Sequence, residues 1–275
     1  MKIDPQFITP EFLQQLAAEL RASRKYRALE LPDSILHDLI TQEMVRHGSQ
    51  KKALDAVRDK LHNIVAPYLG DPDYSAAANK ISAAQSAGTE SLRAACLEVL
   101  TEHASTRERI SLLDHFYPRL WQVTGKPGSI LDLACGLHPF GLPWMGLDTG
   151  VRYYAYDIHK PRVELLNSFF QWTNQSGQAI HEDILVNPPL ISADVALFFK
   201  EAHRFEQRRR GCNLPFWQSL KVRWLLVSLP SKNLSGKRNL IERQRHLVTS
   251  ILAGQPWPVV ELVFDNEIVF CIQLH

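Results

Sequence analysis

From about residue 128 onward, short apolar runs alternate with helical patterns, and this alternation limits the possible fold more than any other feature of the chain. The runs have the length and composition of buried strands and occupy residues 129–134, 152–157, 193–200 and 222–230. The helical patterns between or after them occupy 159–173, 202–220 and 237–253. Strands separated by helices pair in parallel, with helices on both faces of the sheet, so we predict an α/β domain.

Two apolar runs near the C-terminus, 259–264 and 267–274, are joined only by Asp265 and Asn266. Because two residues permit only a hairpin, these strands are predicted to be antiparallel. A parallel sheet closed by such a hairpin is the plan of class I S-adenosylmethionine methyltransferases, which are Rossmann-like. This likeness concerns the fold and does not by itself establish a function.

The first hundred or so residues show helical patterns and no strand pattern. Thr9 is predicted to cap a helix that begins at Pro10, and Asp33 is predicted to cap a second helix. Further helical patterns run from 50 to near Pro67, over 74–86 and over 89–101. We therefore predict an all-helical N-terminal domain, residues 1–101, followed by the α/β domain, residues 102–275.

Charge and cysteine usage restrict the class of protein. The net charge is only +2, but residues 200–245 carry 12 Lys and Arg against 3 Asp and Glu, which favours a polyanionic partner or a membrane surface. Solvated helix faces are a common alternative source of such a cluster. The four cysteines form no C-x-x-C pair, which indicates neither a metal site nor a disulfide framework. With no signal peptide and no apolar run of about 18 residues, we expect a soluble, cytoplasmic protein.

Acidic residues stand at the ends of successive predicted strands. Asp132 ends the first, Asp157 ends the second, and Asp183 ends the following segment. Ligands of open α/β sheets bind beyond these ends, and a carboxylate there can accept both hydroxyl groups of an adenosine ribose. The small residues Ala134 and Gly136 permit close approach to the backbone.

The missing G-x-G-x-x-G pattern disfavours a dinucleotide such as NAD. Asp132 beside this turn suits a cationic sulfonium, so S-adenosylmethionine is the predicted cofactor. The alternative is that Asp132 caps the turn and Asp157 caps a helix.

Several segments resemble the aminoglycoside-resistance 16S rRNA methyltransferases, which methylate N7 of guanine 1405. They are "ASRKYRAL" (22–29), "EHASTRERISLLD" (102–114), "ILDLACGLHPFGLPW" (130–144), "YDIHK" (156–160), "EDIL" (182–185) and "VSLPSKNLSGK" (227–237). The likeness spans most of the chain in order, and "HASTRER" and "ACGL-x-P" are specific to that family.

The resemblance implies a set of cofactor contacts. His103, Ala104, Ser105 and Arg109 match the segment over the methionine end, where Arg109 would pair with the cofactor carboxylate. A helix start, with Ser105 as the cap, is compatible with that role. Ala134 and Gly136 match the cofactor turn, Asp157 the ribose acid, and Asp183 with Ile184 the adenine contacts; Asp132 and Phe199 complete the predicted set.

The chain departs from the family pattern at two places. A Leu-Pro-rich stretch is expected after the fourth strand, but residues 200–217 are polar and basic. The usual Asn of the cofactor turn is His138, which we expect to cap the turn.

Guanine N7 carries a lone pair and no proton, so its methylation needs no general base, and we assign no catalytic residue and no metal ligand. The target base must be displaced from the narrow major groove of A-form RNA. Phe140, Trp144, Phe199 and Trp217 are the candidate stacking partners, although each is more often a core residue.

The expected partner is 16S rRNA in the 30S subunit, contacted by a monomer. The helical domain is expected to dock on the folded rRNA. The predicted RNA contacts are basic residues of the helical domain and of the loop after the fifth predicted strand: Arg21, Arg24, Lys25, Arg27, Arg46, Lys51, Lys52, Lys232, Lys237 and Arg238.

Three alternatives remain open at this stage. The chain could methylate another nucleobase or RNA, or it could be a non-catalytic RNA-binding relative. A dinucleotide oxidoreductase is disfavoured by the missing glycine pattern.

Overall fold

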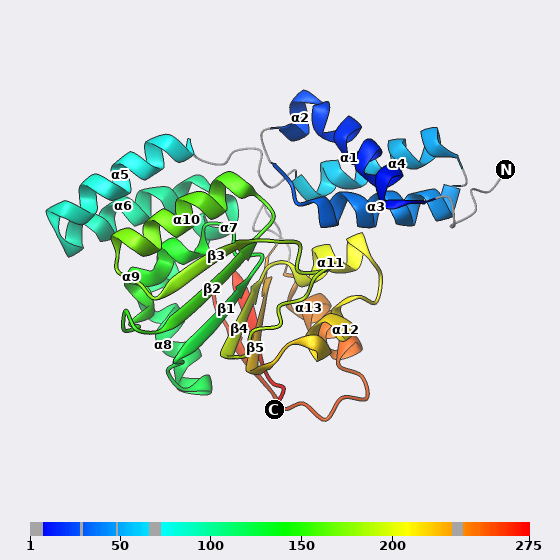
Figure 1. Cartoon of the computed structure of the whole chain (residues 1–275). Helices are drawn as coiled ribbons and strands as arrows, with labels where there is room; N and C mark the ends of the chain where they lie inside the picture. Colours follow the sequence, from blue (N-terminus) through cyan, green and yellow to red (C-terminus); the bar gives the residue numbers. More distant parts are fainter. Residues whose placement is uncertain (1–7, 28–29, 48, 66–72, 233–238) are drawn as a thin grey trace.

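The computed structural model describes residues 8–27, 30–47, 49–65, 73–232 and 239–275 (Figure 1). Its N-terminal part consists of helices: α1 (Pro10–Ala22), α2 (Arg24–Arg27), α3 (Asp33–His47), α4 (Gln50–Val65), α5 (Tyr74–Ala87), α6 (Thr89–Glu102) and α7 (Ala104–Arg107). Thr9 caps α1 as predicted, because its hydroxyl accepts the N–H of Phe12 at 3.3 Å. Asp33 is the first residue of α3 and pairs with Arg21, so its predicted role as a cap is wrong.

A seven-stranded sheet forms the centre of the C-terminal part. Its strands are β1 (Ser129–Leu133), β2 (Arg152–Asp157), β3 (Gly177–His181), β4 (Ala193–Phe199), β5 (Val222–Pro230), β6 (Val259–Val263) and β7 (Glu267–Gln273). They lie in the order β3-β2-β1-β4-β5-β7-β6, and only β7 is antiparallel to its neighbours β5 and β6. The predicted parallel sheet with a C-terminal hairpin is confirmed. β3 is an additional strand that the apolar pattern does not predict.

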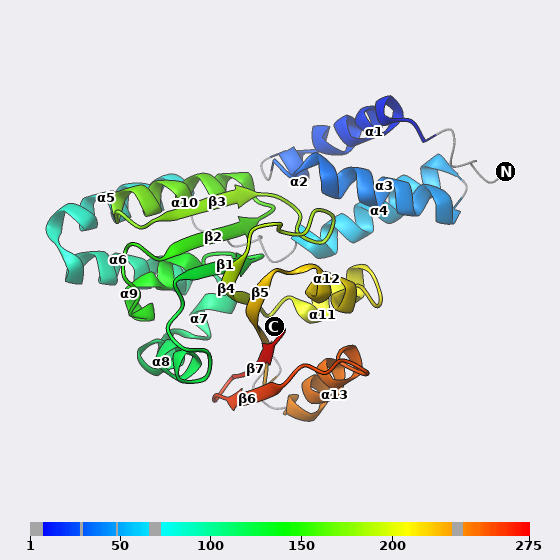
Figure 2. The ribbon, with the colours of Figure 1, turned by 60° about the horizontal axis from the view of Figure 1, so that its bottom comes forward.

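Helices cover both faces of the sheet (Figures 1 and 2). The remaining helical elements are η3 (Ile110–Leu112), α8 (Leu113–Thr124), η4 (His138–Gly141), α9 (Leu142–Met145), α10 (Lys160–Trp172), α11 (Ala202–Arg208), α12 (Asn213–Ser219) and α13 (Ile241–Ile251). One apolar core joins α5, α6, α8 and α10 to strand residues such as Ile130 and Val195. The other joins α11, α12 and α13 to residues such as Leu131 and Ala196. Neighbouring strand residues therefore serve opposite faces, as strand geometry requires.

The helical pattern predicted over 202–220 forms two helices. Gly211 lies between α11 and α12 with φ of +75°, in the left-handed region that favours glycine. The turn redirects the chain, so α11 can reach toward α3 while α12 packs on the sheet.

A separate hydrophobic core belongs to α1–α4 and extends from Leu16 to Val65. By contrast, α5 and α6 pack on the sheet side, where Ile81 and Val99 join the core of α10. Val65 is thus the last residue of the α1–α4 core, and Tyr74 already packs against the core that α5 and α6 share with α10. The division into a docking part, 1–101, and a catalytic part, 102–275, stays a prediction about function.

Gly177 opens β3 directly against the buried ring of Phe170. A Cβ at this position would lie 2.8–3.0 Å from ring atoms of Phe170. We expect Gly177→Ala to lower the free energy of unfolding by about 1–3 kcal/mol in urea denaturation, because overpacking forces the ring out of place. Gly150→Ala, where a Cβ would meet nothing within 4 Å, is the control and should change it by less than about 0.5 kcal/mol. Equal stability of the two variants would contradict this account.

Candidate functional site

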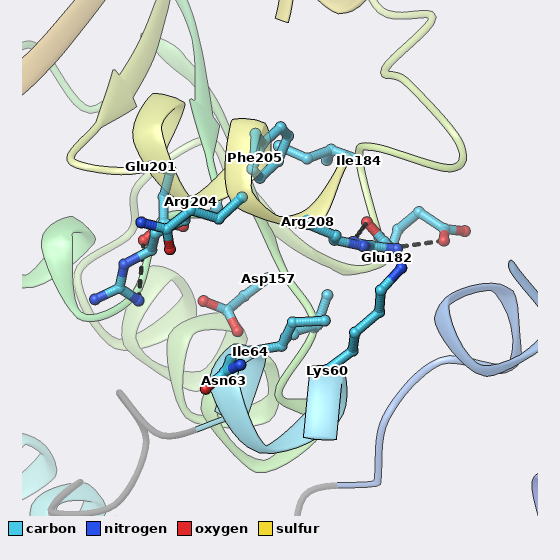
Figure 3. Close-up of a pocket in the computed structure, with 14 residues that line it drawn as sticks. Lys60, Asn63, Ile64, Asp157, Glu182, Ile184, Glu201, Arg204, Phe205 and Arg208 are labelled. Atoms are coloured by element: carbon cyan, nitrogen blue, oxygen red, sulfur yellow. Dashed lines mark hydrogen bonds and ion pairs between the residues drawn. The ribbon is translucent and has the colours of Figure 1, made fainter. Parts of the chain in front are cut away.

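A cavity of about 140 Å³ opens where the carboxyl ends of the parallel strands meet. The strand order reverses between β1 and β4, and ligands of open α/β sheets bind at such a point. Figure 3 shows the cavity between the strand ends, α11 and the last turns of α4. The lining residues are Lys60, Asn63, Ile64, Ala134, Asp157, Ile158, Glu182, Asp183, Ile184, Glu201, Arg204, Phe205, Gln207 and Arg208.

Asp157 ends β2, and its carboxylate points into the cavity (Figure 3). Its Oδ2 accepts the N–H of Gly136 and Nη1 of Arg162, both at 2.9 Å, and its Oδ1 accepts the N–H of His159 at 2.8 Å. The two oxygens of a carboxylate accept about four hydrogen bonds in all, so Asp157 retains the capacity to accept a ribose hydroxyl. The residue therefore fits the predicted role, although it also fixes the start of α10.

The backbone on both sides of the switch point is in the left-handed region. Ala134, after β1, has φ of +52°, and Lys200, after β4, has φ of +62°. Residues other than glycine rarely adopt this backbone conformation, and those that do concentrate at functional sites. Ala134 lines the cavity with the smallest side chain that carries a Cβ, which leaves room for a ligand close to the backbone.

Asp183 and Ile184, the predicted adenine contacts, both line the cavity. Asp183 is buried, and Arg208 of α11 holds both of its oxygens, with Nη1 2.9 Å from Oδ1 and Nη2 2.5 Å from Oδ2. The N–H of Leu185 donates to the same Oδ1 at 3.1 Å. Arg208 thus keeps this acid in a fixed orientation at the edge of the cavity.

Asp132 does not line the cavity and belongs to a buried polar group beside it. Its Oδ2 accepts the hydroxyl of Tyr153 at 2.7 Å and lies 2.8 Å from Nδ1 of His138. Nε2 of His138 lies 2.9 Å from the hydroxyl of Tyr117. The expectation that His138 caps the turn is wrong, because its ring bridges α8 to β1. The role of Asp132 toward a cofactor stays a prediction.

Arg109 is also buried away from the lining residues. It pairs with Glu267 through Nε–Oε2 at 3.0 Å and Nη2–Oε1 at 2.5 Å, and its guanidinium lies 4.7 Å from the ring centroids of Phe116 and Phe199. Although burial opposes ionisation of Glu267, Arg109 holds the pKa of that carboxyl below its ordinary value. His103 ends α6 beside α7. The side chains of Ala104 and Ser105 lie outside the described part of the chain.

The cavity contains side chains that the sequence analysis did not place there. Glu201, Arg204 and Phe205 come from the segment after β4, and Lys60 and Asn63 come from α4. Glu201 could have been found, because it follows a strand end at the edge where ligands bind. The α4 residues carry no local signal, since about a hundred residues of sequence separate them from Asp157.

The sequence matches a family model described as "Ribosomal RNA methyltransferase (FmrO)" over residues 22–270. The chain belongs to this family.

Individual relatives of this rRNA methyltransferase carry names that fit the family. A Serratia marcescens protein named 16S rRNA (guanine(1405)-N(7))-methyltransferase is 33% identical over 216 residues, which cover 78% of this chain and 80% of the relative. A Micromonospora olivasterospora protein of the same name is 30% identical over 256 residues, with 90% and 84% coverage.

Solved structures of the 16S rRNA methyltransferases RmtF and RmtB share the fold. RmtF, in complex with S-adenosyl-L-homocysteine, gives a TM-score of 0.77 at 25% identity and covers 96% of this chain and 99% of its own. RmtB gives 0.76 at 26% identity with the same coverage. The predicted family, fold and enzyme class are thereby confirmed. S-adenosylhomocysteine is S-adenosylmethionine without its transferable methyl group, which agrees with the predicted cofactor.

The basic side chains predicted to contact RNA differ in their exposure. The exposed ones are Arg27, Arg46, Lys51, Lys52 and Lys232. Arg21 instead contacts the carbonyl of Leu31 at 3.2 Å and pairs with Asp33, which ties it to α3. The side chains of Arg24 and Lys25, and all of Lys237 and Arg238, lie outside the described part of the chain.

Two of the four candidate stacking aromatics, Phe140 and Trp217, are fully buried and belong to the core. Trp144 is partly buried under Arg93, whose guanidinium lies 4.8 Å from the ring centroid. Phe199 packs edge-on against Phe116 and His138.

No described helix is both long and apolar enough to cross a membrane. The described residues likewise contain no group of three His, Cys, Asp or Glu side chains placed to hold a metal ion.

The buried position of Glu201 predicts that the stability of this rRNA methyltransferase depends on pH. Burial raises the pKa of Glu201 from 4.5 to about 7, with Arg204, 3.5 Å away, opposing the rise. A carboxyl with a raised pKa stabilises the fold while protonated, and this contribution is lost as the pH rises through about 7.

We therefore expect Glu201→Gln to match the wild type in thermal unfolding at about pH 5 and to unfold several degrees higher at about pH 8. Differential scanning calorimetry measures both values. Glu164→Gln, at an exposed position of α10, is the control and should track the wild type throughout. A constant difference between Glu201→Gln and the wild type across this range would show that ionisation of Glu201 is not responsible.

Proposed function

We propose that the chain transfers the methyl group of S-adenosylmethionine to N7 of guanine 1405 of 16S rRNA in the assembled 30S subunit. It acts as a monomer in the cytoplasm and confers aminoglycoside resistance. The observation that carries the proposal is the cavity at the β1–β4 switch point, edged by Asp157 and Asp183, in a chain of this family. The nucleotide and the atom are those named for the relatives from Serratia marcescens and Micromonospora olivasterospora.

The predicted cofactor residues take separate roles in this proposal. Asp157 accepts hydrogen bonds from the ribose hydroxyls, and Asp183 with Ile184 contacts the adenine. Ala134 and Gly136 allow close approach of the backbone. The methionine end lies under the segment from His103 to Ser105.

In this proposal Arg109 pairs with both Glu267 and the methionine carboxylate. Its Nε and Nη2 already donate to Glu267, so the two carboxylates share one guanidinium. The buried Asp132 and the partly buried Phe199, which packs edge-on against His138, support this end.

S-adenosylmethionine supplies an electrophilic methyl group on a cationic sulfur. The N7 lone pair of the guanine forms the new bond to the methyl carbon, while the carbon–sulfur bond breaks and its electron pair stays on sulfur. N7 loses no proton, so no side chain of the chain needs to act as a base. The contribution of the protein is to align the two reactants and to exclude water from the cavity.

Direct mapping of the product tests the proposal. Purified 30S subunits incubated with the chain and tritiated S-adenosylmethionine should gain one methyl group per subunit, and mass spectrometry of the 16S rRNA should place it at N7 of guanine 1405. A methyl group on another nucleotide would assign the chain to a different RNA methyltransferase activity. Failure of the chain to bind S-adenosylhomocysteine in calorimetry would indicate a non-catalytic RNA-binding relative.

The proposed docking of the helical domain on rRNA makes a separate prediction. Arg24 and Lys25 lie on the short helix α2. The double variant Arg24→Ala/Lys25→Ala should bind 30S subunits at least about ten-fold more weakly, with a salt dependence shallower by about two phosphate contacts, and should bind S-adenosylhomocysteine normally. Lys126→Ala, at the amino end of β1, is the control. Loss of cofactor binding in the double variant would contradict the division of labour.

A further inference from the structure

The helical domain is joined to the adenine end of the cofactor cavity by a chain of buried and partly buried ion pairs. Arg208, which holds Asp183, also places Nη2 3.3 Å from Oδ2 of Asp38 on α3. Arg209 places Nη2 2.6 Å from Oδ1 of the same Asp38. One guanidinium therefore bridges a carboxylate of the cavity and a carboxylate of the helical domain.

The burial of these groups makes the bridge more than a surface contact. The side chains of Asp183, Arg208 and Asp38 are 2%, 8% and 16% exposed, respectively. Removing one partner of a buried ion pair leaves the other charge without compensation, so the remaining groups must rearrange. A change at Asp38 is thus expected to reach Asp183, although Asp38 does not line the cavity.

A second contact ties α3 to the same strand end. The hydroxyl of Ser34 donates to Oε1 of Glu182 at 2.7 Å, and the N–H of Asp183 donates to the same oxygen at 2.7 Å. The cavity itself is lined from both sides, because Asn63 and Ile64 of α4 face the strand ends. The cavity is therefore lined by residues of two hydrophobic cores, that of α1–α4 and that of α11–α13.

We propose that Arg208 and Asp38 are positioning residues for the carboxylate of Asp183, so that cofactor affinity depends on how α3 is docked. This inference rests on the proposed function, in which Asp183 contacts the adenine.

Calorimetric titration of the full chain with S-adenosylhomocysteine tests the proposal. Asp38→Asn and Arg208→Gln should each weaken binding about five-fold or more, which is within the usual range of coupling between sites. The matched control is Glu30→Gln, which removes another ion pair between the helical part and α10: Glu30 with Lys160 at 2.7 Å, an exposed pair that does not touch Asp183. This control should bind as the wild type does.

The double variant separates positioning from general loss of structure. If Asp38 acts through Arg208, Asp38→Asn should add little in an Arg208→Gln background.

The single variants should raise the KM for S-adenosylmethionine and leave kcat at saturating cofactor unchanged. Asp38→Glu, which keeps the charge, should restore most of the affinity. Thermal unfolding of each variant identifies any that fails to fold, in which case Asp38→Ala replaces Asp38→Asn, or Arg208→Lys replaces Arg208→Gln, in the cycle.

The outcomes distinguish this inference from the proposed function. Wild-type affinity in Asp38→Asn, or additive effects in the double variant, would overturn the positioning role even if guanine 1405 is methylated. A wild-type chain that binds S-adenosylhomocysteine but methylates no guanine would overturn the proposed function alone. A wild-type chain that does not bind it would overturn both.

Discussion

A carboxylate buried at the carboxyl edge of a sheet is unfavourable unless donors surround it, and this requirement organises the site. Asp157 receives donors from the turn after β1, from the start of α10 and from Arg162. One negative charge thus fixes the turn after β1, which is 21 residues away in sequence, against the start of α10. Asp183 meets the same requirement through Arg208. The two acids that we propose as cofactor contacts therefore also hold the surrounding elements together.

The segment after β4 shows how a departure from the family pattern is accommodated. In place of a Leu-Pro-rich stretch, Glu201 and the following helix α11, with Arg204 and Arg208, line the cavity. Arg204 pairs with its sequence neighbour Glu201. Arg208 pairs with two acids that are distant in sequence, Asp183 and Asp38. The polar character of α11 is therefore compatible with its place beside the cavity, because Arg204 and Arg208 have acidic partners within the protein. It also attaches the helical part to the strand ends.

Features that depend on local sequence could be predicted, and features that depend on distant contacts could not. The strands of the sheet follow from apolar runs, and Thr9 caps α1 through its own neighbours. β3 is short and largely polar, and it depends on pairing with β2 and on Asn167, whose amide bonds both backbone groups of Ala179. His138 finds its partners on β1 and α8, which no spacing rule brings together.

The account depends on the cavity at the strand ends being the place where the adenosine of the methyl donor binds. A crystal structure of the chain with S-adenosylhomocysteine measures this directly. We expect the ribose hydroxyls within hydrogen-bond distance of the Asp157 carboxylate, with the adenine amino group beside Asp183. A ligand bound elsewhere, or in this cavity with its ribose turned away from Asp157, would contradict the account.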